Sequence, residues 1–270
     1  MFLPLYDGQA IRHIRFQYVT IAIVALNVLV YLVVNQAGFA PFGDFEMAAI
    51  DRAAIALGHV PAVMNEVRVL PSGSDLVPGD AYWPTMVTSA FLHADFWHLV
   101  GNMLFLWVFA DNVEDALGHL RFAVFYVLCI FASVWVHVLA FPDSQSPLIG
   151  ASGAAAGVVG AYLMLHPRVR VWGLVLGRVP LGLPAMWVLG AWVAFQVFMF
   201  VSDAGNPGNQ VAWSAHVGGA LAGIVLVVLM RRRGVPLFDR EIVLPEAVVL
   251  EPDARLPPRV RRPRFGRDAA

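Results

Sequence analysis

Residues 148–165 read LIGASGAAAGVVGAYLML, an apolar run in which Ser152 stands between Gly150 and Gly153. A hydroxyl without a hydrogen-bond partner is costly in hydrocarbon, so a serine in this place needs a reason. One interpretation is packing, because the glycines of the run form a smooth face that lets another helix come close. The other is catalysis. Ser152 would then be a nucleophile at a helix N-terminus, with Gly150 permitting the tight backbone that exposes it and free N–H groups facing a developing negative charge.

The composition is that of a membrane protein. Of the 270 residues, 59% are hydrophobic and 14% are charged, whereas a typical soluble domain has about 25% charged residues. We therefore expect an all-α polytopic membrane protein whose helices contact the lipid bilayer. The formal net charge of −1 gives no reason to expect a nucleic-acid partner. The single cysteine, Cys129, leaves no disulfide framework and no cysteine-based metal site.

Six apolar runs are predicted to be membrane spans, since a bilayer is crossed by about 20 apolar residues in a helix. The apolar pieces around 171–183 are too broken to span. The predicted spans are residues 19–34, 88–110, 122–141, 148–165, 185–201 and 211–230.

These spans divide the chain into three parts. Residues 1–17 form a predicted N-terminal cytoplasmic segment, and residues 18–231 form a membrane domain of six helices. Within this domain, residues 35–84 are a long external first loop, in which 47–57 could be a short surface helix. Residues 232–270 are rich in proline and arginine, which predicts a disordered cytoplasmic tail.

Arginine sets the predicted orientation, because the chain contains no lysine. With alternating spans, one side of the membrane receives only Arg52 and Arg68, and the other side receives all the remaining arginines. The positive-inside rule then places both termini in the cytoplasm. Ser152 and His216 lie near the same, outer face in this arrangement. We expect a multi-pass protein of the cell's inner (plasma) membrane.

Four polar side chains inside the predicted spans share this outer side: His98, Asn102, Ser152 and His216. Polar residues within spans are expensive and are functional candidates by default. A serine becomes a nucleophile when a base takes its proton, and histidine is the usual base. His216 is the best candidate, because the glycines that follow it let its helix approach the helix of Ser152. The alternative is a structural histidine bonded to a backbone carbonyl.

His98 and Asn102 are four residues apart, so they share one helix face. Asparagine is a poor zinc ligand and the glutamate of an H-E-x-x-H motif is absent, so we expect no metal. Two neutral hydrogen-bond donors on one face suit the stabilisation of an oxyanion. The alternative is interhelical hydrogen bonding, which is common for both residue types in membrane spans.

Three motifs together resemble the signature motifs of the rhomboid intramembrane serine proteases. They are HLVGN at 98–102, GASG at 150–153 and AHVGGA at 215–220, and residues 107–118 resemble the turn that follows the second span in this family. Their order and their placement in the spans agree with the six-helix core of the bacterial members. The likeness extends over about residues 19–230.

The resemblance implies an intramembrane serine endopeptidase with a Ser–His dyad. Ser152 would be the nucleophile and His216 the general base and then acid. The oxyanion would be stabilised by the backbone N–H of Ser152 and by the side chains of His98 and Asn102, with Gly150 setting the loop geometry. The reaction would be acyl transfer followed by hydrolysis, the substrates would be transmembrane proteins cut in or near their spans, and no cofactor is implied.

The chain departs from the family pattern in two places. Ala156 stands where some members carry a tyrosine that stacks on the catalytic histidine, so the sequence does not say what orients His216. Trp83-Pro84 differs from a Trp-Arg pair that other members have in the first loop. The candidates for a substrate gate are Gly101, Trp192 and Phe195.

Two other functions compete with this interpretation. A catalytically inactive rhomboid-like protein would bind membrane proteins without cutting them, although the presence of both Ser152 and His216 argues against it. A small transporter could use buried polar residues to line a path, but no acidic residue lies in mid-span and no inverted repeat is evident. The sequence leaves the substrate, the pathway and the oligomeric state open.

Overall fold

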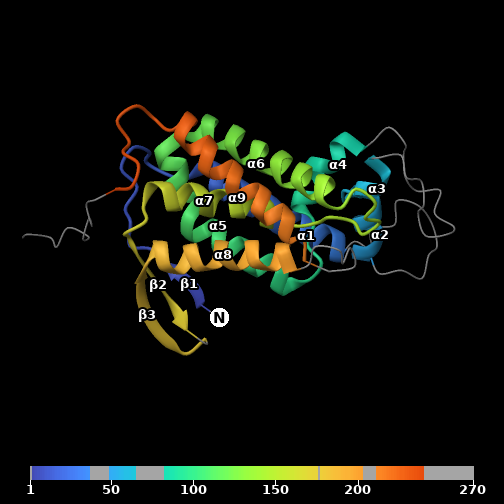
Figure 1. The fold of residues 1–270 in the computed structure, drawn as a ribbon, viewed down its shortest axis with the longest axis horizontal. Helices are drawn as coiled ribbons and strands as arrows, with labels where there is room; N and C mark the ends of the chain where they lie inside the picture. The colour runs from blue at the N-terminus through green and yellow to red at the C-terminus, as the bar shows by residue number, and fades with distance from the viewer. Residues whose placement is uncertain (1, 37–48, 65–81, 176, 203–210, 240–270) are drawn as a thin grey trace, which may run out of the picture.

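Apolar helices dominate the computed structural model of the chain, which describes residues 2–36, 49–64, 82–175, 177–202 and 211–239 (Figure 1). A long helix overlaps each predicted span. These helices are α1 (Tyr18–Gln36), α5 (Phe96–Leu117), α6 (His119–Ala140), α7 (Ser152–Leu165), α8 (Ala185–Ser202) and α9 (Trp213–Met230). Short helices lie at one end of the bundle: α2 (Ala49–Leu57), α3 (Pro61–Met64), α4 (Tyr82–Thr88) and the 3₁₀ helix η1 (Ser89–Phe91).

Within the described residues, three helices are long and apolar enough to cross a membrane: α6, α8 and α9. Helix α7 and the first 17 residues of α1 are apolar but shorter, and α5 carries acidic residues in its last turns. The structure thus supports a mostly helical membrane protein, and the count of six spans stays a prediction.

Two helices begin at least four residues later than predicted. Helix α5 begins at Phe96 rather than near residue 88, because the Asp95 side chain accepts a hydrogen bond from the His98 N–H, at 2.9 Å, and caps the helix there. Helix α7 begins at Ser152 rather than at residue 148. The backbone of Leu148 instead pairs with that of His59 in an isolated β-bridge. In the first loop, α2 matches the described part, Ala49–Leu57, of the surface helix predicted for residues 47–57, and residues 47–48 lie outside the described part of the chain.

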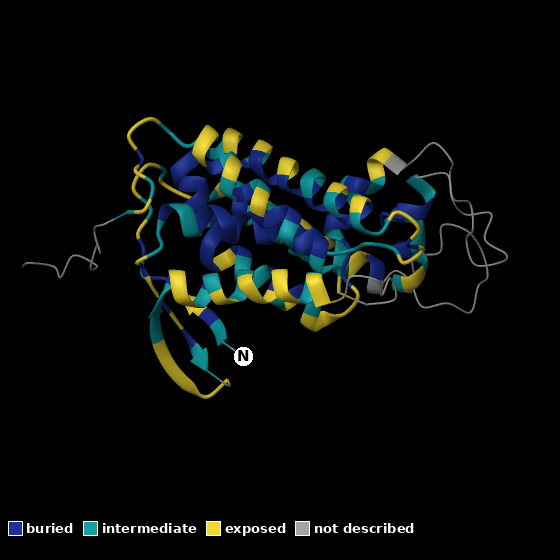
Figure 2. Ribbon diagram, viewed as in Figure 1, coloured by how far each residue is buried: buried dark blue, intermediate teal, exposed yellow. Residues whose placement is uncertain are grey.

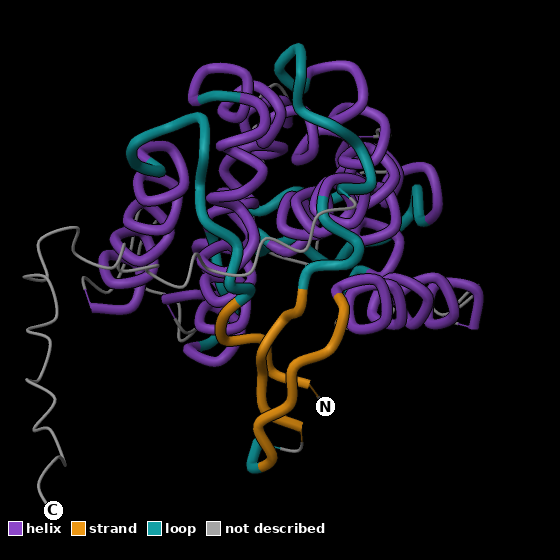
Figure 3. The backbone as a smooth tube through the Cα atoms, turned by 90° about the vertical axis from the view of Figure 1, so that its left-hand side faces the viewer, coloured by secondary structure: helices purple, strands orange, loops and turns teal. Residues whose placement is uncertain are grey.

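A small sheet corrects the all-α prediction. Strands β1 (Phe2–Tyr6), β2 (Arg170–Val175) and β3 (Val179–Pro184) form an antiparallel sheet in the order β1-β2-β3. The pieces that are too broken to span are thus a β-hairpin, whose valines and tryptophan favour extended backbone. Figures 1 and 3 show the sheet standing out sideways from the end of the bundle where α7 ends and α8 begins.

The tightest packing in the bundle joins α7 to α9. A Cβ added to Gly223 would overlap the carbonyl oxygen of Gly157, and one added to Gly219 would overlap that of Gly153. The two backbones therefore touch, which is possible because glycine has no side chain. Figure 2 shows the consequence: α7 is buried among its neighbours, whereas α8 has a largely exposed outer surface.

We predict that Gly223→Ala destabilises the protein. The added methyl group has no space against the Gly157 carbonyl, and overpacking of this kind costs about 1–3 kcal/mol. Gly190→Ala in α8 is the matched control, since no atom lies within 4 Å of its added Cβ and alanine favours helix by about 1 kcal/mol over glycine. Thermal unfolding of both variants in one detergent is the measurement. Equal stability of the two variants would contradict the packing described here.

At the end of the bundle where α7 ends, two carboxylates of α5 hold the N-terminal segment. The Asp115 carboxylate accepts hydrogen bonds from the backbone N–H groups of Arg12, His13 and Ile14, at 2.6–3.0 Å. Glu114 accepts from the N–H groups of Val19 and Thr20 and from the Thr20 hydroxyl. Its charge thereby satisfies free donors at the N-terminus of α1, where an anion is favourable. This pair of acids joins the start of the chain to α5.

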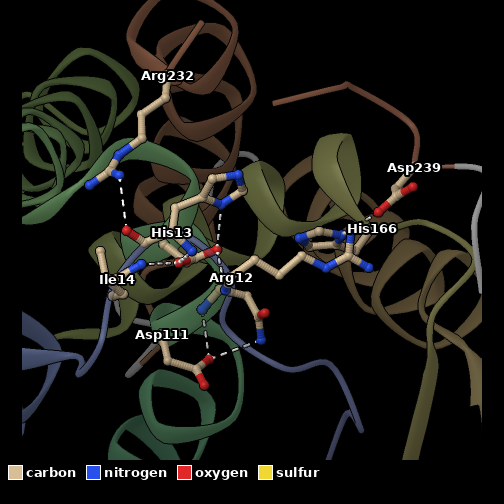
Figure 4. A network of polar contacts seen from close by, with 9 residues as sticks. Arg12, His13, Ile14, Asp111, His166, Arg232 and Asp239 are labelled. Carbon is tan, nitrogen blue, oxygen red and sulfur yellow. Dashed lines mark hydrogen bonds and ion pairs between the residues drawn. The ribbon is translucent and has the colours of Figure 1, made fainter. Parts of the chain in front are cut away.

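The segment after α9 also lies against this end. The backbone N–H of Arg232 donates to the Ala116 carbonyl, and those of Phe238 and Asp239 donate to Met164 and Leu165. The Arg232 side chain bonds the carbonyl of His13 (Figure 4). Residues 232–239 thus differ from the disordered tail predicted for them. Residues 240–270 lie outside the described part of the chain.

Asp7, just after β1, has an unusual environment. Its carboxylate accepts hydrogen bonds of 2.8 Å from the Tyr162 hydroxyl and from the Asn112 amide, and the same amide nitrogen donates to Asp111. Burial raises the pKa of Asp7 from the usual 3.8 to about 6, and the bond from Tyr162 opposes this rise. The folded protein therefore holds the Asp7 proton to a higher pH than the unfolded chain does.

We predict that Asp7 contributes stability at about pH 4 that is lost as the pH rises to 6, because its folded carboxyl binds more protons than its unfolded one in this window. The loss from Asp7 is at most about 3 kcal/mol, from the size of the pKa difference. Asp7→Asn should remove this contribution, which makes the slope of unfolding temperature against pH more positive in this range. Asp143→Asn, an exposed carboxylate elsewhere, is the control and should leave the slope unchanged. An unaltered slope in Asp7→Asn would refute the assignment.

Candidate active site

Ser152 is the first residue of α7, and the turn before it depends on glycine. Gly150 has a φ of +116°, a conformation that other residues rarely adopt. Its N–H donates to the carbonyl of Ser89, at 2.9 Å, which ties the turn to η1. The first N–H groups of α7 have no partner within the helix, so they are available to an anion beside Ser152.

The Ser152 hydroxyl and the His216 ring are joined by a hydrogen bond. His216 lies in the first turn and a half of α9, and its Nε2 is 2.8 Å from Ser152 Oγ. The other ring nitrogen, Nδ1, is 2.7 Å from the side-chain oxygen of Gln196. A carbonyl oxygen only accepts, so Nδ1 carries the proton and Nε2 is free to accept from the serine. This is the geometry of a nucleophile with its general base.

Gln196 is the site residue that sequence reasoning missed. It lies on α8, where most side chains face outward, yet it is only 4% exposed. Trp192, one turn earlier, stacks on the His216 ring with centroids 6.1 Å apart and the planes 29° apart. These two residues hold the imidazole where Ala156 leaves no aromatic partner. The signal was present in the sequence, because Gln196 is a lone amide within an apolar span.

His98 and Asn102 both point at the turn before Ser152. A Cβ added to Gly150 would lie 2.8 Å from two ring atoms of His98 and 3.7 Å from the Asn102 amide nitrogen. Helix α5 thus presents both side chains at one point, as their spacing predicts. The Asn102 nitrogen is buried and has no hydrogen-bond partner within the described residues. An unused donor aimed at the loop of Ser152 fits an oxyanion site better than a bond between helices.

A small cavity adjoins Ser152. Its walls are largely short or aliphatic side chains, contributed by η1, α6, α7 and α9. The residues that line it include Ala90, Ile130, Ser133, Val134, Gly153 and Ala215. The cavity has room for about one water molecule, so a side chain of about methyl size is the largest that fits without movement of the walls. Among the described residues, no group of three or more His, Cys, Asp or Glu side chains could hold a metal ion.

The remaining candidates are placed as follows. Added atoms at Gly101 would meet open space on α5. Phe195 on α8 contacts Trp213, with ring centroids 5.8 Å apart. Trp83 lies exposed on α4. The third gate candidate, Trp192, stacks on His216 as described above.

We predict that Gln196→Ala lowers turnover by about 10- to 150-fold. A hydrogen bond to a group that becomes charged is worth about 1.5–3 kcal/mol, and each 1.36 kcal/mol is tenfold in rate. The substrate KM should change little, because Gln196 acts through His216. Gln196→Glu keeps an acceptor for Nδ1 and should recover most of the rate.

Phe198→Ala, an exposed position on the same helix, is the control and should keep the parent turnover. The measurement is kcat and KM on a membrane-anchored peptide, with thermal unfolding of the same preparations. A destabilised Gln196→Ala protein with unchanged kcat would show that Gln196 only packs α8 against α9.

The chain is similar to known proteins over the region that holds this site. The Rhomboid domain family matches residues 80–233, more than half of the chain, and this range includes all the site residues named above. Twenty-four curated proteins match the chain with statistical significance.

Three of these relatives illustrate the range. "Rhomboid protein 1, mitochondrial" of Saccharomyces cerevisiae is 34% identical over 147 residues, which cover 52% of this chain and 40% of the relative. "Rhomboid-like protein 11, chloroplastic" of Arabidopsis thaliana is 28% identical, covering 59% and 57%. "Presenilin-associated rhomboid-like protein, mitochondrial" of Homo sapiens is 28% identical, covering 52% and 36%. The match therefore spans between about a third and three fifths of each of these relatives.

Proposed function

The chain belongs to the rhomboid family, and we propose that it is an intramembrane serine endopeptidase in which Ser152 and His216 form the catalytic dyad. One observation carries the proposal: the 2.8 Å contact between Ser152 Oγ and His216 Nε2, with Nδ1 held by Gln196. Family membership supports the reaction class, and the geometry supports the roles of the residues.

In the proposed reaction, Ser152 Oγ attacks the carbonyl carbon of the scissile peptide bond while His216 Nε2 takes its proton. The negative oxygen that forms receives hydrogen bonds from the Ser152 N–H, the Asn102 amide and the His98 ring. His216 then gives the proton to the leaving amine. A water molecule, activated by the same imidazole, hydrolyses the acyl-enzyme and restores Ser152. Apart from the substrate and this water molecule, each step uses only side chains and backbone of this chain.

The substrates would be membrane-anchored proteins cut in or near a span. The cavity beside Ser152 favours a small residue next to the cut bond, because its walls include Ala90, Gly153 and Ala215. The substrate segment must also reach Ser152 in extended form. Small or helix-breaking residues near the cut bond would help the substrate helix to unwind.

We further propose six membrane spans with both termini on the arginine-rich side. The support is the six long helices together with the arginine asymmetry, since an even number of crossings returns the chain to its starting side. The plasma-membrane location stays a prediction, because the relatives named above are mitochondrial or chloroplastic proteins.

We predict that Ser152→Ala and His216→Ala each abolish both cleavage of a membrane-anchored substrate and covalent labelling by a fluorophosphonate. The double variant should be scarcely worse than either single one, because residues that act as a unit are strongly non-additive. Ser133→Ala is the matched control. Its hydroxyl also borders the cavity, but it donates to the Ile130 carbonyl, at 2.8 Å, so labelling should persist.

Two outcomes would contradict the dyad. Labelling that survives Ser152→Ala would place the nucleophile elsewhere. If the activity losses of the two single variants multiplied in the double variant, Ser152 and His216 would act independently and not as a dyad. A wild-type protein that binds membrane-anchored substrates without labelling or cleavage would instead be the inactive rhomboid-like protein considered above.

A further inference from the structure

The three-stranded sheet carries apolar side chains on both of its faces. The pairing register places Leu3, Trp172 and Leu174 on one face and Phe2 and Val175 on the other. In a sheet that packs on a core with one face and meets water with the other, the second face is polar. In this sheet neither face is polar.

Much of this apolar surface is uncovered. Trp172 is 48% exposed, Val179 57% and Leu181 41%, and Tyr6 at the end of β1 is 60% exposed. The exposed surface continues onto the start of α8, where Trp187 is 64% exposed. Apolar surface that continues from a sheet to a membrane-exposed helix indicates one shared apolar environment.

The charges of the hairpin are all of one sign. Arg168, Arg170 and Arg178 are exposed, and residues 166–185 contain no acidic residue. Asp7, the acidic residue that directly follows β1, is buried and accepts hydrogen bonds from Tyr162 and Asn112. Tryptophan and tyrosine beside arginine are typical of the membrane interface, where aromatic rings lie at the depth of the headgroups and arginine meets anionic lipid.

The position of the sheet fits this depth. It stands out sideways from the ring of helices, level with the end of α7 and the start of α8, rather than continuing along the bundle axis (Figures 1 and 3). Strands β1 and β3 each have one unpaired edge, and unpaired backbone groups are costly in hydrocarbon. The headgroup layer offers water to these edges and acyl chains to the apolar faces.

We propose that β1, β2 and β3 form a membrane-surface paddle that lies in the headgroup layer and binds anionic phospholipids through Arg170 and Arg178. The proposal requires that the bundle spans a membrane, and it does not depend on catalysis. A second copy of the chain is a poorer occupant of the sheet edges. Pro4 in β1 and Pro180 in β3 remove backbone donors from the two edge strands and so disfavour edge-to-edge pairing.

The test places a nitroxide spin label on the full chain in vesicles. Val179→Cys reports on the sheet, in a Cys129→Ala background. Arg233→Cys, an exposed position at the same end of the bundle, is the matched control. The parent chain, which keeps the buried Cys129, measures how much label attaches without an added cysteine. If Cys129→Ala unfolds the protein, Val179→Cys and Arg233→Cys are made in this parent chain instead. Accessibility to oxygen and to a neutral, water-soluble nickel chelate is measured in vesicles of phosphatidylcholine alone or mixed with phosphatidylglycerol.

We expect the label at residue 179 to be several-fold less accessible to the nickel chelate than the label at residue 233, and more accessible to oxygen. Adding phosphatidylglycerol should lower the nickel accessibility at 179 further. That additional effect should disappear in the Arg170→Gln, Arg178→Gln double variant, while the oxygen preference remains.

Three results would overturn the proposal. Equal nickel accessibility at residues 179 and 233 would place the sheet in water. Spin–spin broadening at 179 that vanishes when labelled chains are diluted with unlabelled ones would assign the surface to a second copy. If phosphatidylglycerol did not change the nickel accessibility at residue 179, the sheet would not bind anionic phospholipid. The Ser152→Ala chain should give the same accessibilities as the parent, which separates this test from that of the proposed reaction.

Discussion

The direct contact between the backbones of α7 and α9 is the constraint on which the rest of the structure depends. Gly219 and Gly223 lie against the carbonyl groups of Gly153 and Gly157, where a methyl group has no room. Because the two helices begin at the same end of the bundle, this contact brings their first turns together. The Ser152 hydroxyl and the His216 ring therefore meet within hydrogen-bond distance, without a loop to position them.

The site is completed by two helices that pack less tightly. Helix α5 contributes His98 and Asn102, which converge on the turn at Gly150, and α8 contributes Gln196, which bonds His216. Helix α8 is mostly exposed within the bundle. The tautomer and orientation of His216 thus depend on the position of α8, because the bond from Nδ1 to Gln196 decides which ring nitrogen faces the serine.

The other end of the bundle is organised by carboxylates rather than by glycine. Glu114 and Asp115 collect backbone donors of the N-terminal segment, and the segment after α9 bonds the end of α7. The sheet emerges here, between the end of α7 and the start of α8. One end of the molecule is therefore built for the chemistry that we propose, and the other for holding the chain ends and the sheet in place.

The sequence by itself determined the membrane class, the approximate place of the long helices and the candidates Ser152, His216, His98 and Asn102. These follow from composition and from spacings of a few residues, which one helix fixes locally. Only the tertiary structure decided that Gln196 holds His216 and that residues 2–6 pair with residues 172–175. Contacts between segments far apart in the chain leave no local periodicity, because they depend on how whole helices pack.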